Sequence, residues 1–147
     1  MTNPERHLHA FVLCVMDKTP SPTKNQNRVV RVIGDLWIVG ESTGQMPGGG
    51  AATSIVTVGY NPDAKRFVGT WIGSMMAHLW VYSGWIENDD TLVLEAEGPR
   101  CDAPGQTTLY RDSNQFRGND TRIFRAACRQ EDGSWNEMMC FEYRRAK

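Results

Sequence analysis

The chain has 147 residues, with 16 basic and 17 acidic side chains and a formal net charge of -1. This balance argues against a general nucleic-acid binder and against a polybasic membrane-surface protein, both of which carry excess basic charge. Hydrophobic residues make up 40% and aromatic residues 10% of the chain, which also contains 14 Gly. The composition indicates a globular protein rich in turns and rings, and we expect residues 1–147 to form a single β domain.

Residues 1–27 are predicted to form a divergent first strand at 10–17, followed by a long polar loop. The apolar part of this segment is too short to span a membrane. It also lacks the basic start and cleavage site of a secretory signal. The four cysteines, at positions 14, 101, 128 and 140, form no C-x-x-C pair, which excludes zinc-ribbon and thioredoxin motifs on spacing. We therefore expect free thiols and a cytoplasmic protein.

Clusters of Gly, Asn, Asp and Pro interrupt the rest of the chain at regular intervals, and the segments between them are short and rich in β-branched and aromatic residues. No segment has a sustained helical period with caps. The predicted strands, about ten in number, are residues 10–17, 28–33, 36–45, 51–60, 65–73, 76–86, 91–98, 106–116, 121–130 and 135–144. Such a series of hairpins predicts an all-β antiparallel up-and-down barrel, because closure removes exposed edges.

The first clear hairpin turns at Gly34-Asp35. A two-residue loop there pairs Ile33 with Leu36. In this register Trp37 faces the barrel interior, and Glu41 follows on the same face towards a polar mouth. The inner face holds the larger ring.

The next hairpin has a four-residue turn at 61–64, which pairs Val58 with Phe67. Phe67 and Trp71 then share a face with Gly69 and Gly73. Glycines in such positions are useful where a strand bends sharply, as at a barrel corner. They either contact a ligand or make room for neighbouring rings, and both interpretations are open.

Strand 76–86 carries Met76, His78, Trp80 and Tyr82 on one face. Pairing through a turn at 87–90 places Tyr82 opposite Glu95. This face is either a polar pocket wall or an exposed aromatic ladder, and a one-residue change in the loop reverses the assignment of Glu95.

A hairpin at Asp132-Gly133 pairs Arg125 with Cys140. Alternation along the strand then directs Cys128 and Cys140 to opposite faces, so we expect no disulfide between them.

Several sequence blocks together resemble a bacterial family known as domain of unknown function 1579. They are LWIVGE at 36–41, MPGG at 46–49, GYNP at 59–62, RFVGTWIGSMM at 66–76, HLWVY at 78–82, EAEGP at 95–99 and YRD at 110–112. The similarity extends from about Val30 to the C-terminal residues 143–145. It implies a calycin-like barrel, related in shape to lipocalins and fatty-acid-binding proteins, and implies no activity. Such barrels often open with a Gly-x-Trp strand, which residues 10–17 lack, so the N-terminal segment or a second copy of the chain would fill the gap. A homodimer is therefore one expected assembly.

Residues with catalytic potential are few. His78 is more often a packed, hydrogen-bonded strand residue than a ligand or base, although an axial haem ligand remains an alternative by analogy of fold. His7 and His9 have no evident third ligand, so we expect no metal site. Glu41 with Glu95 or Glu97 could form an acid pair, but solvated carboxylates are the commoner case. We find no nucleophile elbow.

The leading hypothesis is a non-enzymatic barrel that binds a small, largely apolar ligand, with no cofactor. The candidate ligand-binding residues are Trp37, Glu41, Phe67, Trp71, Met76, His78, Trp80, Tyr82, Glu95 and Arg111. Arg111 would anchor a carboxylate if it faces inward, and otherwise it is a surface cation. The alternatives are a haem-binding or enzymatic barrel that uses His78, and a solid barrel whose exposed Trp85 and Trp135 form a partner surface.

Overall fold

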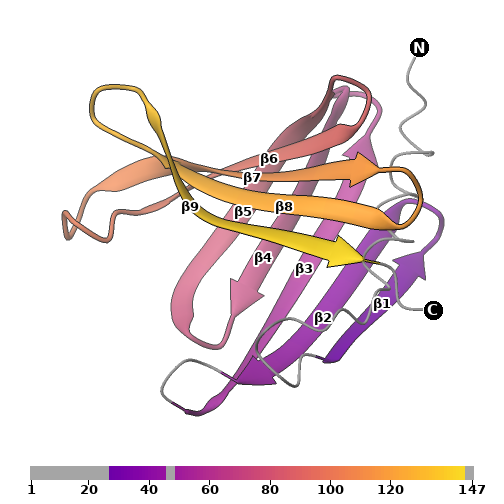
Figure 1. The fold of residues 1–147 in the computed structure, drawn as a ribbon, viewed down its shortest axis with the longest axis horizontal. Helices are drawn as coiled ribbons and strands as arrows, with labels where there is room; N and C mark the ends of the chain where they lie inside the picture. The colour runs from indigo at the N-terminus through magenta and orange to yellow at the C-terminus, as the bar shows by residue number, and fades with distance from the viewer. Residues whose placement is uncertain (1–26, 46–48, 145–147) are drawn as a thin grey trace.

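The computed structural model describes residues 27–45 and 49–144, which form one antiparallel sheet of nine strands in sequence order (Figure 1). The strands are β1 (Asn27–Ile33), β2 (Trp37–Gln45), β3 (Ala51–Asn61), β4 (Arg66–Gly73), β5 (Met76–Glu87), β6 (Thr91–Pro99), β7 (Thr107–Arg117), β8 (Thr121–Arg129) and β9 (Trp135–Arg144). The sequence-based strand boundaries for these nine are confirmed to within one residue. The predicted strand at 10–17, together with Cys14, His7 and His9, lies outside the described residues.

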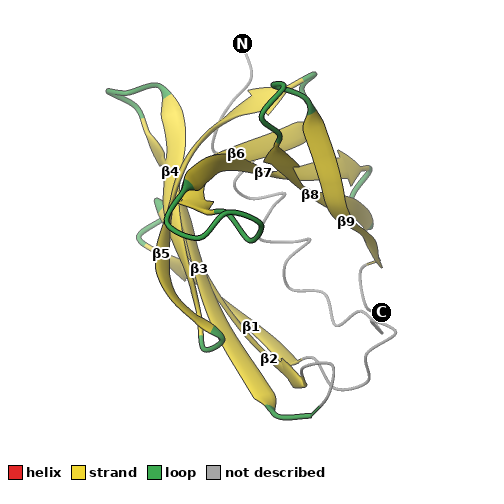
Figure 2. Ribbon diagram, turned by 90° about the vertical axis from the view of Figure 1, so that its left-hand side faces the viewer, coloured by secondary structure: helices red, strands yellow, loops and turns green. Residues whose placement is uncertain are grey.

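The sheet curls strongly, so that β1–β5 and β6–β9 face each other across its inner side (Figure 2). The all-β up-and-down architecture is confirmed. In the described part of the chain β1 and β9 do not pair, so the curl is that of a half-barrel and not of a closed barrel. No helix among the described residues is long and apolar enough to cross a membrane.

The core lies on the inner face. Its buried members are Ile38, Val58, Phe67, Tyr82, Leu92, Leu94 and Ala96. Burying a large apolar side chain contributes about 1.5–3 kcal/mol, and Phe67 and Ile38 are among the largest side chains that are fully buried. The inner face of this half-barrel is therefore the side that holds the sheet in its curled form.

Strand glycines allow this curl by two means. A Cβ atom on Gly69 would lie 2.0 Å from the Thr57 carbonyl oxygen, and one on Gly84 would lie 2.0 Å from the Val93 carbonyl oxygen. At Gly98 the nearest atoms would instead belong to the Trp80 ring, at 2.2 Å. Gly98 therefore makes room for a ring, as one interpretation of the strand glycines predicts, whereas Gly69 and Gly84 are required by the close approach of the neighbouring backbone.

Two hairpins differ from the predicted register by one residue. In the β1–β2 hairpin, Gly34 and Asp35 both adopt positive φ, and the ladder begins with Ile33 opposite Trp37. The predicted pairing of Ile33 with Leu36 is therefore wrong, because Leu36 belongs to the loop. Since side chains alternate, this shift reverses the faces of β2: Ile38 is buried and Trp37 is 40% exposed.

The β5–β6 hairpin repeats this loop geometry. Asn88 and Asp89 both adopt positive φ, and the ladder begins with Glu87 opposite Thr91. Glu95 consequently pairs with Ser83, and the predicted pairing of Glu95 with Tyr82 is wrong. The loop has three residues, 88–90, and not the four of the predicted turn, because Glu87 belongs to the strand; this is the one-residue change in the loop that reverses the assignment of Glu95.

The β3–β4 hairpin is shifted by two residues, which preserves the faces. Phe67 pairs with Tyr60, not with Val58 as predicted. Phe67 and Trp71 nevertheless remain on the inner face, where Phe67 is buried and Trp71 packs against the core.

The β8–β9 hairpin pairs Arg125 with Cys140, as predicted, but Cys128 pairs with Asn136 and not with Glu137, as the two-residue loop predicts. Cys101, Cys128 and Cys140 are free thiols. The ladder shifts between Ala126 and Ala127, which creates a bulge at Met138.

Candidate ligand-binding cavity on the inner face

A cavity of about 150 Å³ opens on the inner face of the half-barrel. Eight of the nine strands contribute to its wall, because the curl brings both halves of the sheet around it. The lining residues are Gly40, Ser42, Ser54, Val56, Trp71, Tyr82, Leu94, Asp112, Asn114, Arg122, Phe124 and Tyr143.

One polar pair in the wall joins β5 to β7. The Tyr82 phenol donates a 2.6 Å hydrogen bond to Oδ2 of Asp112. Burial raises the pKa of Asp112 above its usual range, and the hydrogen bond from Tyr82 opposes this shift in part. Burial, followed by the charge of Asp112 and this hydrogen bond, also raises the pKa of Tyr82. Asp112 is therefore protonated over a wider pH range than an exposed aspartate.

A second polar pair joins β7 to β8. Nη1 of Arg122 donates a 2.6 Å hydrogen bond to Oδ1 of Asn114, and both residues are buried. The guanidinium of Arg122 also lies 4.4 Å from the ring centroid of Tyr143, a cation–π distance. Arg122 stays charged at all ordinary pH values, so the cavity combines a fixed positive charge with a carboxyl group that resists ionisation.

Two of the ten sequence-predicted site residues, Trp71 and Tyr82, line this cavity. Phe67 lies beneath it in the core. The structure thus brings together the inner-face aromatics of β4 and β5, as the alternation in these strands predicts.

Three other candidates, Met76, His78 and Trp80, lie in the N-terminal half of β5 and do not line the cavity. Nε2 of His78 lies 3.0 Å from the Glu97 carbonyl oxygen, and the His78 ring meets Trp80 edge-on at 4.7 Å. The indole of Trp80 donates to Sδ of Met76 at 3.0 Å. His78 is thus a packed, hydrogen-bonded strand residue here, and a haem ligand role for it stays a prediction.

The remaining four candidates lie on the outer face, so the predicted inward placement of Trp37 and Glu41 is wrong. Arg111 pairs with Glu95 at 2.6 Å on this face, which settles the open orientation of both residues. The Arg111 guanidinium also lies 4.2 Å from the ring centroid of Trp135. Arg111 is therefore an outward cation, and its pairing with Glu95 does not involve the cavity.

Sequence reasoning missed Asp112, Asn114, Arg122 and Tyr143 as site residues. One signal was present in the sequence. Asp112 and Asn114 alternate along β7 and lie on the same face of the sheet as Leu94, a buried residue of the neighbouring strand β6. A polar residue directly opposite a buried leucine needs a partner on the same face. Arg122 and Tyr143 face each other across the β8–β9 ladder, and the register that pairs Arg125 with Cys140 already predicts this. That they share a cavity with residues of β2 and β3 follows only from the curl of the sheet.

Comparison with known proteins adds a family. Residues 10–145 match the model of a family described as "Protein of unknown function (DUF1579)". The chain belongs to this family. Neither the search of curated proteins nor the search of solved structures found a match.

Among the described residues no group of three or more His, Cys, Asp or Glu side chains is placed to hold a metal ion.

Proposed function

We propose that the protein binds a small ligand with an apolar body and one polar end in the inner-face cavity, and that it does so without catalysis. The observation that supports this is the lining: rings and aliphatic groups form most of the wall, while Asp112, Asn114 and Arg122 meet at one side. Ligand sites in proteins are typically apolar hollows with a few convergent polar groups.

The size of the cavity narrows the ligand class. An apolar cavity of about 150 Å³ accommodates one benzene ring, and the inner-face cavity has this volume. The body of the ligand is therefore one ring or a short branched chain. Trp71 and Phe124 provide the surfaces against which it packs.

The polar end of the ligand would meet two kinds of group. Arg122 offers a fixed positive charge, and the hydroxyl of Tyr82 and the carboxyl group of Asp112 can donate hydrogen bonds to the ligand or accept them from it. A ligand whose polar end accepts hydrogen bonds fits this arrangement better than a cationic one. Desolvating a cation beside a buried guanidinium would be unfavourable.

Single-ring probes of different charge test the proposal. We expect benzoate and phenol, but not benzylamine, to show saturation transfer from the protein in ligand-observed NMR. Filling the cavity by Ser54→Leu should abolish the transfer, since Ser54 lines the cavity on β3.

Ser83→Leu is the matched control. Ser83 lies on the outer face of β5, where its hydroxyl accepts a 2.8 Å hydrogen bond from Arg66. This variant should retain the transfer. If Ser54→Leu, folded as judged by circular dichroism, binds the probes as well as the wild type does, the cavity is not the binding site and the proposal is wrong.

A further inference from the structure

A second cavity, of about 310 Å³, lies at the end of the sheet where the β6–β7 loop meets β8 and β9. It shares no lining residue with the first cavity. Three sulfur-bearing side chains line it, from three separate segments: Cys101 in the β6–β7 loop, Cys128 on β8 and Met138 on β9. We call it the sulfur cavity. Both of its cysteines are free thiols.

Met138 reaches the sulfur cavity through an irregularity of the sheet. The β8–β9 ladder shifts at this point, so that Ala126 pairs with Met139 and Ala127 with Glu137, leaving Met138 as the additional residue. Bulges of this kind re-aim a side chain and are common beside functional sites. The bulge therefore adds a thioether to a cavity that already holds two thiols.

Tyr110 lines the sulfur cavity together with both thiols. It pairs directly with Cys128 in the β7–β8 ladder. Its phenol donates a 2.6 Å hydrogen bond to the Pro99 carbonyl oxygen, which holds the ring against the segment that leads to Cys101.

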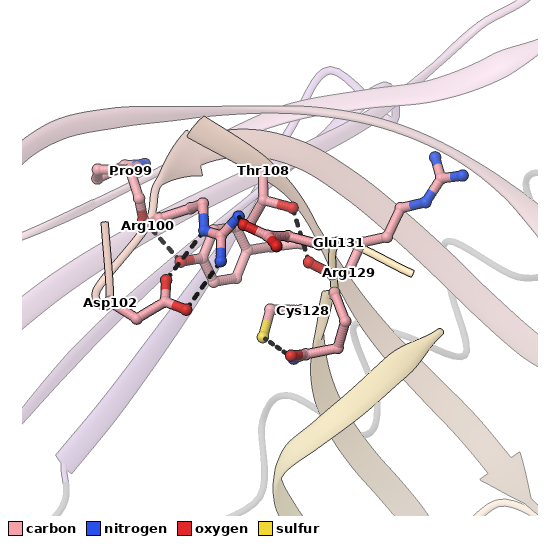
Figure 3. Close-up of polar contacts among 9 residues, drawn as sticks. Pro99, Arg100, Asp102, Thr108, Cys128, Arg129 and Glu131 are labelled. Atoms are coloured by element: carbon pink, nitrogen blue, oxygen red, sulfur yellow. Dashed lines mark hydrogen bonds and ion pairs between the residues drawn. The ribbon is translucent and has the colours of Figure 1, made fainter. Parts of the chain in front are cut away.

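The walls of the sulfur cavity are held in place by an ion-pair clamp. Arg100 donates to Asp102 at 2.8 Å and to Glu131 at 3.1 Å, which ties the β6–β7 loop to the β8–β9 loop (Figure 3). Gln130 Nε2 donates to Sγ of Cys128 at 3.6 Å. Arg100 and Arg129 also line the cavity.

The donor set defines the class of ligand. Thiolate and thioether sulfurs are soft ligands that select soft ions such as Cu(I). Structural zinc sites instead need four ligands drawn from Cys, His and carboxylates, and no group of three such residues exists among the described residues. We propose that the sulfur cavity binds one Cu(I) ion through the thiolates of Cys101 and Cys128 and the thioether of Met138.

The binding step involves no change of oxidation state. Two copper–sulfur bonds form to the thiolates as two S–H bonds break, and about two protons per ion leave to solvent. The resulting site, one Cu(I) ion with two thiolates, carries one negative charge.

A competition titration tests the proposal. The reduced full-length chain is titrated under anaerobic conditions with Cu(I) held as its bicinchoninate complex. We expect one ion per chain to transfer, with proton release in unbuffered solution. Cys101→Ser and Cys128→Ser should each weaken binding at least about 100-fold, and Met138→Leu by about 10-fold; loss of a second-shell partner alone typically costs 10- to 100-fold.

Cys140→Ser serves as the control. Cys140 lies on the outer face of β9, opposite Arg125, so this variant should bind Cu(I) as the wild type does. X-ray absorption of the loaded wild type should show sulfur as the dominant nearest neighbour. Unchanged affinity in Cys101→Ser or Cys128→Ser, or loss of the ion in Cys140→Ser, would overturn the proposal. Because the first cavity shares none of these residues, its ligand-binding test is unaffected by either outcome.

Discussion

The Tyr82 phenol and the Asp112 carboxylate meet at 2.6 Å although their strands, β5 and β7, are not neighbours in the sheet. The hydrogen bond spans β6 on the inner face, where Leu94 pairs with both Gly84 and Asp112. It exists only because the sheet is curved. This contact links the curl of the half-barrel to the polar side of the cavity.

Removing the donor of this bond should destabilise the fold. Tyr82→Phe leaves a buried carboxyl group without its partner, and we expect a loss of about 1–3 kcal/mol in the free energy of unfolding, measured by urea denaturation. Tyr110→Phe is the control, because its hydroxyl contacts an exposed carbonyl group and should contribute less. Equal losses in the two variants would show that burial of the Tyr82–Asp112 bond has no special effect.

The pH dependence of stability should carry the signature of Asp112. Burial raises its pKa in the folded state, so folding favours the protonated form. The stability that this group contributes is complete below the ordinary carboxyl pKa of about 4, and it is lost as the pH rises through the raised pKa. Urea titrations at several pH values should therefore show that Asp112→Asn gains stability relative to the wild type as the pH rises from about 4 towards neutrality.

Asp132 provides a control of opposite sign. Hydrogen bonds from the side chain and backbone of Ser134 lower the pKa of Asp132. Its contribution is present above the ordinary carboxyl pKa and is lost as the pH falls through the lowered value. Asp132→Asn should thus lose stability relative to the wild type at neutral pH and converge with it in acid. The account of Asp112 is contradicted if both variants change in the same direction.

The sequence predicts the strands well and the site poorly, for a physical reason. Strand ends depend on local turn chemistry, and Gly34, Asn88 and Asp89 are residue types that favour the positive φ angles of tight turns. The number of loop residues is less evident, because Leu36 resembles a strand residue and yet belongs to the loop. That single residue exchanged the faces of Trp37 and Ile38. The β8–β9 hairpin pairs Arg122 with Tyr143, but only the curl of the sheet brings this pair to the same cavity as Ser54, and no hairpin-level pattern contains that curl.

The glycines that permit the curl should tolerate no side chain. Gly84→Ala places Cβ against the Val93 carbonyl oxygen, which cannot move without breaking the ladder, and we expect a loss of about 3 kcal/mol in the free energy of unfolding, measured by thermal or urea denaturation. Gly118→Ala meets no atom within 4 Å and bears only the strain of its φ of +66°, about 1–2 kcal/mol. If Gly84→Ala loses less stability than Gly118→Ala, the close approach of Gly84 to the backbone of β6 does not shape the sheet.

The cation–π contact between Arg111 and Trp135 on the outer face should contribute to the free energy of unfolding. A double-mutant cycle with Arg111→Met and Trp135→Leu is expected to give a coupling energy of about 0.5–1 kcal/mol, the range for exposed cation–π pairs. Glu95 stays in place in all variants, so the ion pair is lost equally in both arms that lack Arg111. If the effects of the two substitutions add strictly, the contact between Arg111 and Trp135 does not stabilise the fold.

Native mass spectrometry of the protein purified gently from its source tests ligand binding in the inner-face cavity most directly. The wild type and Ser83→Leu are predicted to carry a bound small molecule whose body is the size of one ring, and Ser54→Leu is predicted to carry none. A ligand retained by folded Ser54→Leu, or a wild-type protein that carries no ligand and accepts none of the single-ring probes, would contradict the account.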